Sequence, residues 1–99
     1  MIITESRIDK ALRITLEGSL NAVTTPQLEA LLRTSLDGIT EIVFDLDKLV
    51  YISSAGLRVL YAAKNLMNKV GGNLLIYHVR PDIREVFDVT GLSKVLTLL

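Results

Sequence analysis

Two adjacent serines, Ser53 and Ser54, are the residues of this chain best placed to do chemistry. The apolar run 41–46 before them is typical of a buried strand, and residues 57–70 after them are typical of a long helix. Both hydroxyls therefore fall near a helix start, where free backbone N–H groups and the helix dipole tolerate an added anion. The position suits a serine that is switched by phosphorylation, and it equally suits an ordinary N-cap.

Three other polar residues are candidates for chemistry. Asp45 and Asp47 have the spacing of an acidic catalytic or metal-binding pair. We expect instead that Asp45 accepts hydrogen bonds from loop N–H groups at a strand end, and that Asp47 is a solvated turn residue. The only histidine, His78, could pair with a serine, but no Gly-x-Ser-x-Gly turn surrounds Ser54. A small serine hydrolase is thus the less favoured reading, and we expect a structural His78, no metal site, no cofactor and no enzymatic activity.

The composition limits the possible classes of protein. The chain has 99 residues, 49% of them hydrophobic, which predicts one domain over residues 1–99 with a single core. It has no cysteine, so disulfides and thiolate metal sites are excluded. A net charge of zero without a basic stripe argues against nucleic-acid binding. Short, interrupted apolar runs predict no membrane span, and the absence of a secretory signal predicts a cytoplasmic protein.

The first half of the chain alternates strand and helix patterns. Residues 2–8 and 11–17 are strand-like, and the second run alternates apolar and polar positions. Residues 18–23 are expected to be a connection, after which Thr25 and Pro26 have the order of an N-cap and a first helical residue. The apolar face of this helix is predicted to consist of Leu28, Leu31, Leu32 and Leu36.

The second half repeats this order. A helix is predicted to begin near Ser54 and to end at the pair Gly71 and Gly72. A strand at 73–79, a short helix at 81–90 and an edge strand at 95–99 should follow. The sheet-facing stripe of the long helix is predicted to be Val59, Ala62, Ala63, Leu66 and Val70.

This order predicts a single α/β domain with a mixed sheet of four to five strands and helices mainly on one face. In such sheets, ligands and partners tend to meet the carboxyl ends of strands, where helices begin. Ser53 and Ser54 fall at such an end.

The segment 53–57, Ser-Ser-Ala-Gly-Leu, resembles the Asp-Ser-Ser/Thr-Gly-Leu signature of the STAS domain in bacterial anti-sigma-factor antagonists. Four further segments resemble parts of that family in the same order, so the resemblance covers essentially the whole chain. They are residues 16–21, 43–46, 71–72 and 81–92.

Two positions depart from the family pattern. Alignment on Gly56 places Ser54 at the family's phosphoacceptor serine and Ser53 at the position of the family's Asp. Asn21 also stands where the family usually has Asp. Two acidic positions near the switch are therefore neutral in this chain, and Ser53 is an alternative acceptor.

The resemblance implies a partner-switching mechanism. The unphosphorylated protein would bind an anti-sigma factor that is also a serine kinase, and so release the sigma factor. Phosphorylation on serine would abolish binding, and a serine phosphatase would reset the switch. Related alternatives are a STAS module of a stressosome-like complex or an accessory subunit of lipid transport.

The partner-binding surface is expected to centre on the start of the second helix. Leu57 and Tyr61 lie one helical turn apart, and they are either an exposed apolar patch or a second core contact. The expected surface comprises Ser19, Asn21, Ser53, Ser54, Gly56, Leu57, Arg58 and Tyr61.

Overall fold

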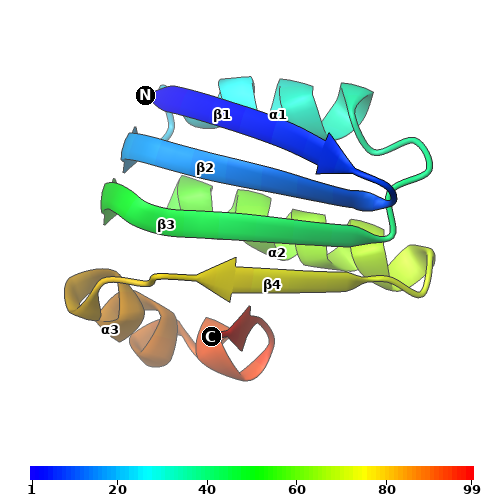
Figure 1. Ribbon diagram of the computed structural model, residues 1–99. Helices are drawn as coiled ribbons and strands as arrows, with labels where there is room; N and C mark the ends of the chain where they lie inside the picture. Colours follow the sequence, from blue (N-terminus) through cyan, green and yellow to red (C-terminus); the bar gives the residue numbers. More distant parts are fainter.

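The protein folds around one five-stranded sheet, and the computed structural model describes all of residues 1–99. Along the chain the elements are β1 (Ile2–Ile8), β2 (Ala11–Leu20), α1 (Thr25–Thr34), β3 (Glu41–Ile52), α2 (Ser54–Lys69), β4 (Asn73–Tyr77), α3 (Pro81–Thr90), a 3₁₀ turn (Leu92–Lys94) and β5 (Thr97–Leu98). The strands lie side by side in chain order (Figure 1). β1 is antiparallel to β2 and all other neighbours are parallel, which confirms the mixed sheet.

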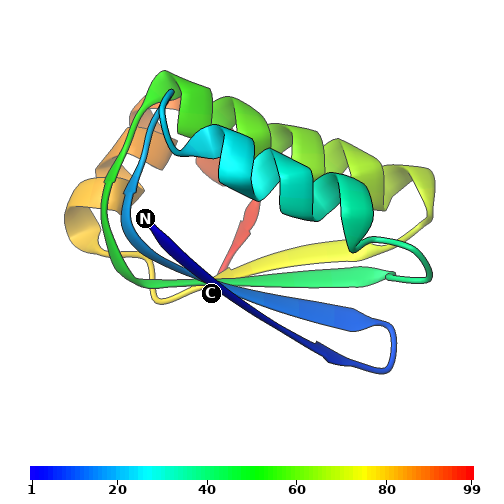
Figure 2. The ribbon, with the colours of Figure 1, turned by 90° about the horizontal axis from the view of Figure 1, so that it is seen from above.

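Alternation along the strands gives the sheet one covered and one open face. In β2, Leu12, Ile14 and Leu16 are buried, while Arg13 and Glu17 between them are exposed. Both α1 and α2 lie side by side over the covered face, and the opposite face carries no helix (Figure 2). The buried residues of strands and helices form one apolar cluster of 22 side chains.

Two central strands are longer than the sequence patterns predict. β2 continues through the expected connection to Leu20, and β3 continues past Asp47 to Ile52. The added parts pair with each other, and the register shifts near Glu17 and Gly18. Asp47 is therefore not a turn residue. Irregular pairing of the bulge type accommodates the polar and glycine residues within the strands, although their sequence pattern predicts strand ends.

Helix boundaries and faces also need correction. The N-cap of α1 is Thr24 rather than Thr25. In α2, Val59 and Ala63 are buried as expected, but Ala62, Leu66 and Val70 are exposed. The buried stripe is Gly56, Leu57, Val59, Leu60, Ala63 and Met67. The helix is rotated about its axis relative to the predicted orientation, because its first turn packs closely on the ends of β2 and β3.

The C-terminal part differs in detail. β4 ends at Tyr77, because His78 adopts a left-handed backbone conformation with φ of 59°. Gly91 ends α3 in the expected left-handed conformation. The 3₁₀ turn was not predicted, and it shortens the last strand to Thr97–Leu98.

Candidate functional site

The two serines at the start of α2 have different roles. Ser53 is the N-cap, with an extended backbone, and its hydroxyl oxygen accepts a hydrogen bond from the N–H of Gly56 at 3.4 Å. Ser54 is the first residue of the helix, and its side chain is exposed and makes no hydrogen bond. The alternative interpretation of Ser54 as an ordinary N-cap is therefore wrong. Ser53 supplies the cap, which leaves the Ser54 hydroxyl exposed and without a hydrogen bond.

Gly56 lies on the inner side of this first turn. A Cβ at this position would come within 2.8 Å of the Ile52 side chain and 2.9 Å of the Leu20 carbonyl oxygen. The missing side chain thus lets α2 sit on the ends of β2 and β3. Leu57 is also buried, with 7% of its surface exposed, so it is a core contact rather than part of an exposed patch.

The exposed side of α2 carries three of the expected partner-binding residues. Ser54, Arg58 and Tyr61 follow one another at intervals of four and three residues, which places them on one face of the helix. Tyr61 is 44% exposed, and Arg58 is also exposed. This face offers a hydroxyl, a cation and an aromatic ring to a partner.

The connection between β2 and α1 lies directly beside the serines. The carbonyl oxygen of Leu20 accepts a hydrogen bond from the N–H of Ser53 at 2.9 Å, and Ser19 pairs with Tyr51. The structure therefore brings Ser19 and the neighbouring Asn21 to the start of α2, both half-buried.

Asn21 organises the turn into α1. Its side-chain Oδ1 accepts hydrogen bonds from the N–H groups of Val23 at 2.9 Å and Thr24 at 3.1 Å. The Thr24 hydroxyl in turn donates to the carbonyl oxygen of Ser19 at 2.7 Å. An amide oxygen accepts these bonds as a carboxylate oxygen would, so the turn does not need the negative charge of Asp.

Sequence reasoning missed three exposed apolar residues at this end of the molecule. Val23 is 85% exposed in the turn before α1, and Val50 and Tyr51 are exposed on the last part of β3. The last two were not considered because β3 was expected to end before them. The pairing of Ser19 with Tyr51 places Val50 and Tyr51 at the end of the sheet where α2 begins.

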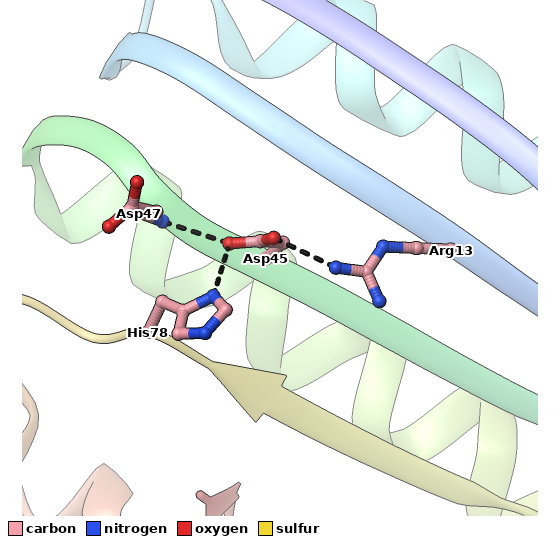
Figure 3. Close-up of polar contacts among 4 residues, drawn as sticks. All are labelled: Arg13, Asp45, Asp47 and His78. Carbon is pink, nitrogen blue, oxygen red and sulfur yellow. Dashed lines mark hydrogen bonds and ion pairs between the residues drawn. The ribbon is translucent and has the colours of Figure 1, made fainter.

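A second polar cluster lies around Asp45 (Figure 3). Its carboxylate accepts hydrogen bonds from Arg13 at 2.9 Å and from the N–H of Asp47 at 3.1 Å. It also contacts Nδ1 of His78 at 3.0 Å. Partial burial alone would raise the pKa of Asp45, but the hydrogen bonds from His78, Asp47 and Arg13 outweigh it and lower the pKa below its usual value. The cluster ties β2, β3 and the segment before α3 together.

This geometry does not support the catalytic alternatives. Asp47 contributes its backbone N–H rather than its carboxylate to the Asp45 cluster. His78 is bonded to Asp45, and no hydrogen bond joins it to Ser54, so the nucleophile and base of a serine hydrolase are not assembled. No group of three or more His, Cys, Asp or Glu side chains is arranged to hold a metal ion. None of the helices is long and apolar enough to cross a membrane.

The fold and this site define a known family. The model of the STAS domain family matches residues 3–99, and the chain belongs to that family. A protein of Bordetella bronchiseptica with the provisional name anti-sigma factor antagonist BtrV is 38% identical over 96 residues, covering 96% of this chain and 83% of its own.

Solved structures show the same fold. An anti-sigma factor antagonist from Mycobacterium paratuberculosis is similar with a TM-score of 0.85 and 26% identity, over 98% of this chain and 83% of its own. The Bacillus cell fate determinant SpoIIAA, solved in its phosphorylated form, has a TM-score of 0.79 and 20% identity, over 99% of this chain and 91% of its own.

Proposed function

We propose that this protein is an anti-sigma factor antagonist that is switched by phosphorylation of Ser54. The observation that carries the proposal is the exposed Ser54 hydroxyl, which has no hydrogen-bond partner, at the first position of α2 in a STAS domain. The names of BtrV and of the mycobacterial relative support the function, and the phosphorylated form of SpoIIAA supports the switch. In this proposal the chain is a binding module rather than an enzyme.

The unphosphorylated form would bind an anti-sigma factor that is also a serine kinase. The contact surface would consist of the exposed face of α2 together with the turn at Asn21, with Tyr61 and Val23 supplying apolar area and Arg58 a cation. Truncation of a buried apolar anchor at an interface commonly costs more than about 1 kcal/mol. Gly56 and Leu57 would act indirectly, by fixing the position of α2.

Phosphorylation would end this binding without unfolding the domain. The phosphate adds a charge of about −1.5 to −2 at neutral pH. At the positive end of α2 the anion is compatible with the helix, and Arg58 lies one turn further along the same face. The effect falls on the interface, through the bulk of the phosphate and the cost of desolvating it. A serine phosphatase would restore the binding form.

The test is an incubation of the protein with an anti-sigma factor kinase from the same organism and ATP. Intact mass and peptide mapping should show one phosphate on Ser54, and titration calorimetry should show that the phosphorylated protein no longer binds the kinase. Phosphate only on Ser53 would assign the switch to the other serine. The proposal would be contradicted if none of the organism's anti-sigma factor kinases binds or modifies the protein.

A further inference from the structure

A groove of about 730 Å³ runs between α1 and α2, and of the residues expected to bind the partner only Arg58 lines it. The two helices lie side by side and run in the same direction, so both begin at the same end of the groove (Figure 2). At that end lie Thr25 and Ala55, and at the other lie Leu36 and Leu66. Leu66 lies eleven positions after Ala55 on α2, which corresponds to a length of about 16 Å.

The groove combines an apolar floor with cations that have no partner in the chain. Leu32 and Val59 are buried at its base, and Leu66 is partly open on its wall. Arg33 and Arg58 line the groove, whereas the four ion pairs of the protein are formed by other residues. Glu29 is the only acidic residue that lines it. An apolar ligand that carries a negative charge matches this lining.

Thr25 marks the polar end of the groove. Only 4% of its surface is exposed, and the side-chain hydrogen bonds of this turn involve Asn21 and Thr24 but not the Thr25 hydroxyl. No fully buried side-chain polar atom of the protein lacks a partner, so this hydroxyl keeps an opening to the outside. Thr25 lines the groove, and a group bound there would complete its hydrogen bonding.

We infer that this groove binds a single-chain anionic amphiphile, such as a fatty acid. Its acidic head would lie between the Thr25 hydroxyl and the Arg58 guanidinium, at the end where both helices begin. Its chain would lie along Val59, Ala62 and Leu66, whose length suits a medium-length acyl chain. The inference does not depend on the proposed partner, although Arg58 borders both surfaces.

The lining favours a narrow amphiphile over an acidic helix of a partner protein. The volume is in the range of small-molecule sites, which span about 300–1,000 Å³. Thr25 and Arg58 lie at the end where both helices begin, whereas Glu29 and Arg33 lie further along α1. A polar group at one end matches a ligand with one head. A helix bearing acidic residues along its length would also meet the negative charge of Glu29, which lies between Thr25 and Arg33 on α1.

The test is titration calorimetry of the whole protein with dodecanoate below its micelle concentration, with acetate, dodecanol and dodecyl phosphate as comparisons. We expect saturable binding of one dodecanoate and no binding of acetate. Dodecanol should bind at least tenfold more weakly, because it lacks the charge. Shortening the chain should weaken binding about fourfold per methylene group. Equal binding of dodecyl phosphate would identify the site as one for anionic heads in general, and weaker binding as one for carboxylates.

Three variants locate the ligand. Arg58→Gln should weaken dodecanoate binding at least tenfold, whereas Arg84→Gln on α3 should leave it unchanged. Ala62→Phe fills the groove from an exposed helix position and should abolish binding while leaving the melting curve cooperative. Unsaturable binding, equal binding of dodecanol, or binding that is insensitive to both Arg58→Gln and Ala62→Phe would overturn the inference. So would saturable binding of an acidic amphipathic peptide that dodecanoate does not displace.

Discussion

The Ser53 hydroxyl oxygen accepts a hydrogen bond from the backbone N–H of Gly56, with an N–O distance of 3.4 Å. This contact links the N-cap of α2 to Gly56, the residue at which the helix packs against β2 and β3. Ser54 lies between them in sequence but faces outward. Ser53 and Gly56 therefore fix the start of α2, and a modification of the Ser54 side chain should not disturb the helix.

The first prediction separates the two serines by stability. Ser53→Ala should lower the free energy of unfolding by about 1 kcal/mol, because it removes the N-cap. Ser54→Ala should change it by less than about 0.5 kcal/mol, as is usual at exposed positions. Urea denaturation of both variants measures the difference. A larger loss for Ser54→Ala would mean that Ser54 also supports the helix.

A negative charge at Ser54 should be tolerated by the fold. Ser54→Asp places the charge in the first turn of α2, where the helix dipole favours it by about 0.3–1 kcal/mol. Its melting temperature should lie within a few degrees of the parent protein, while its binding to the anti-sigma factor should be lost. Ser54→Asn, of similar size but neutral, is the matched control and should keep most of the binding.

A side chain at Gly56 should destabilise the protein. The Cβ of Gly56→Ala would approach the side chains of Ile52 and Leu20 and the Leu20 carbonyl oxygen at less than 3.0 Å. Overpacking of this kind costs about 1–3 kcal/mol. One of the close atoms is the backbone carbonyl oxygen of Leu20, which cannot move aside easily. We therefore expect the cost to exceed the gain of about 1 kcal/mol in helix propensity when glycine is replaced by alanine. Unchanged or raised stability in urea denaturation would show that α2 shifts easily.

Tyr61 and Leu57 should respond in opposite ways. Tyr61→Ala should weaken binding of the anti-sigma factor by more than about 1 kcal/mol, with little change in the melting curve. Leu57→Ala should instead lower the free energy of unfolding by about 2–5 kcal/mol, because Leu57 is buried in the core. Calorimetric binding and thermal melting of both variants form the comparison. A large destabilisation by Tyr61→Ala would place Tyr61 in the core.

Asp45 should contribute to acid sensitivity. Its pKa is lower in the folded protein than the value of about 3.9 expected in the unfolded chain, so on acidification the unfolded chain takes up this proton first. The stabilisation is present above about pH 4 and is lost as the pH falls through the folded pKa. Asp45→Asn should therefore flatten the fall of unfolding free energy as the pH drops below about 5. Asp47→Asn, whose carboxylate accepts no hydrogen bond, is the control and should keep the slope.

The sequence by itself determined the order of the elements, the mixed sheet and the position of the two serines at a helix start. Period-two alternation in 11–17, the apolar run 41–46 and the glycines after the long helix are local signals, so they can be recognised without knowledge of contacts. The family resemblance depended on the same local segments. It singled out Ser54, and the chemistry of that serine remains a prediction.

Only the tertiary structure decided which face each residue presents. The face that α2 turns to the sheet follows from the close approach of Gly56 to Leu20, a residue distant in sequence, and in this orientation Leu57 is buried. The extended parts of β2 and β3 are stable because they pair with each other across a shifted register, which no single segment reveals. The groove between α1 and α2 likewise exists only because two separate helices lie over one face of the sheet.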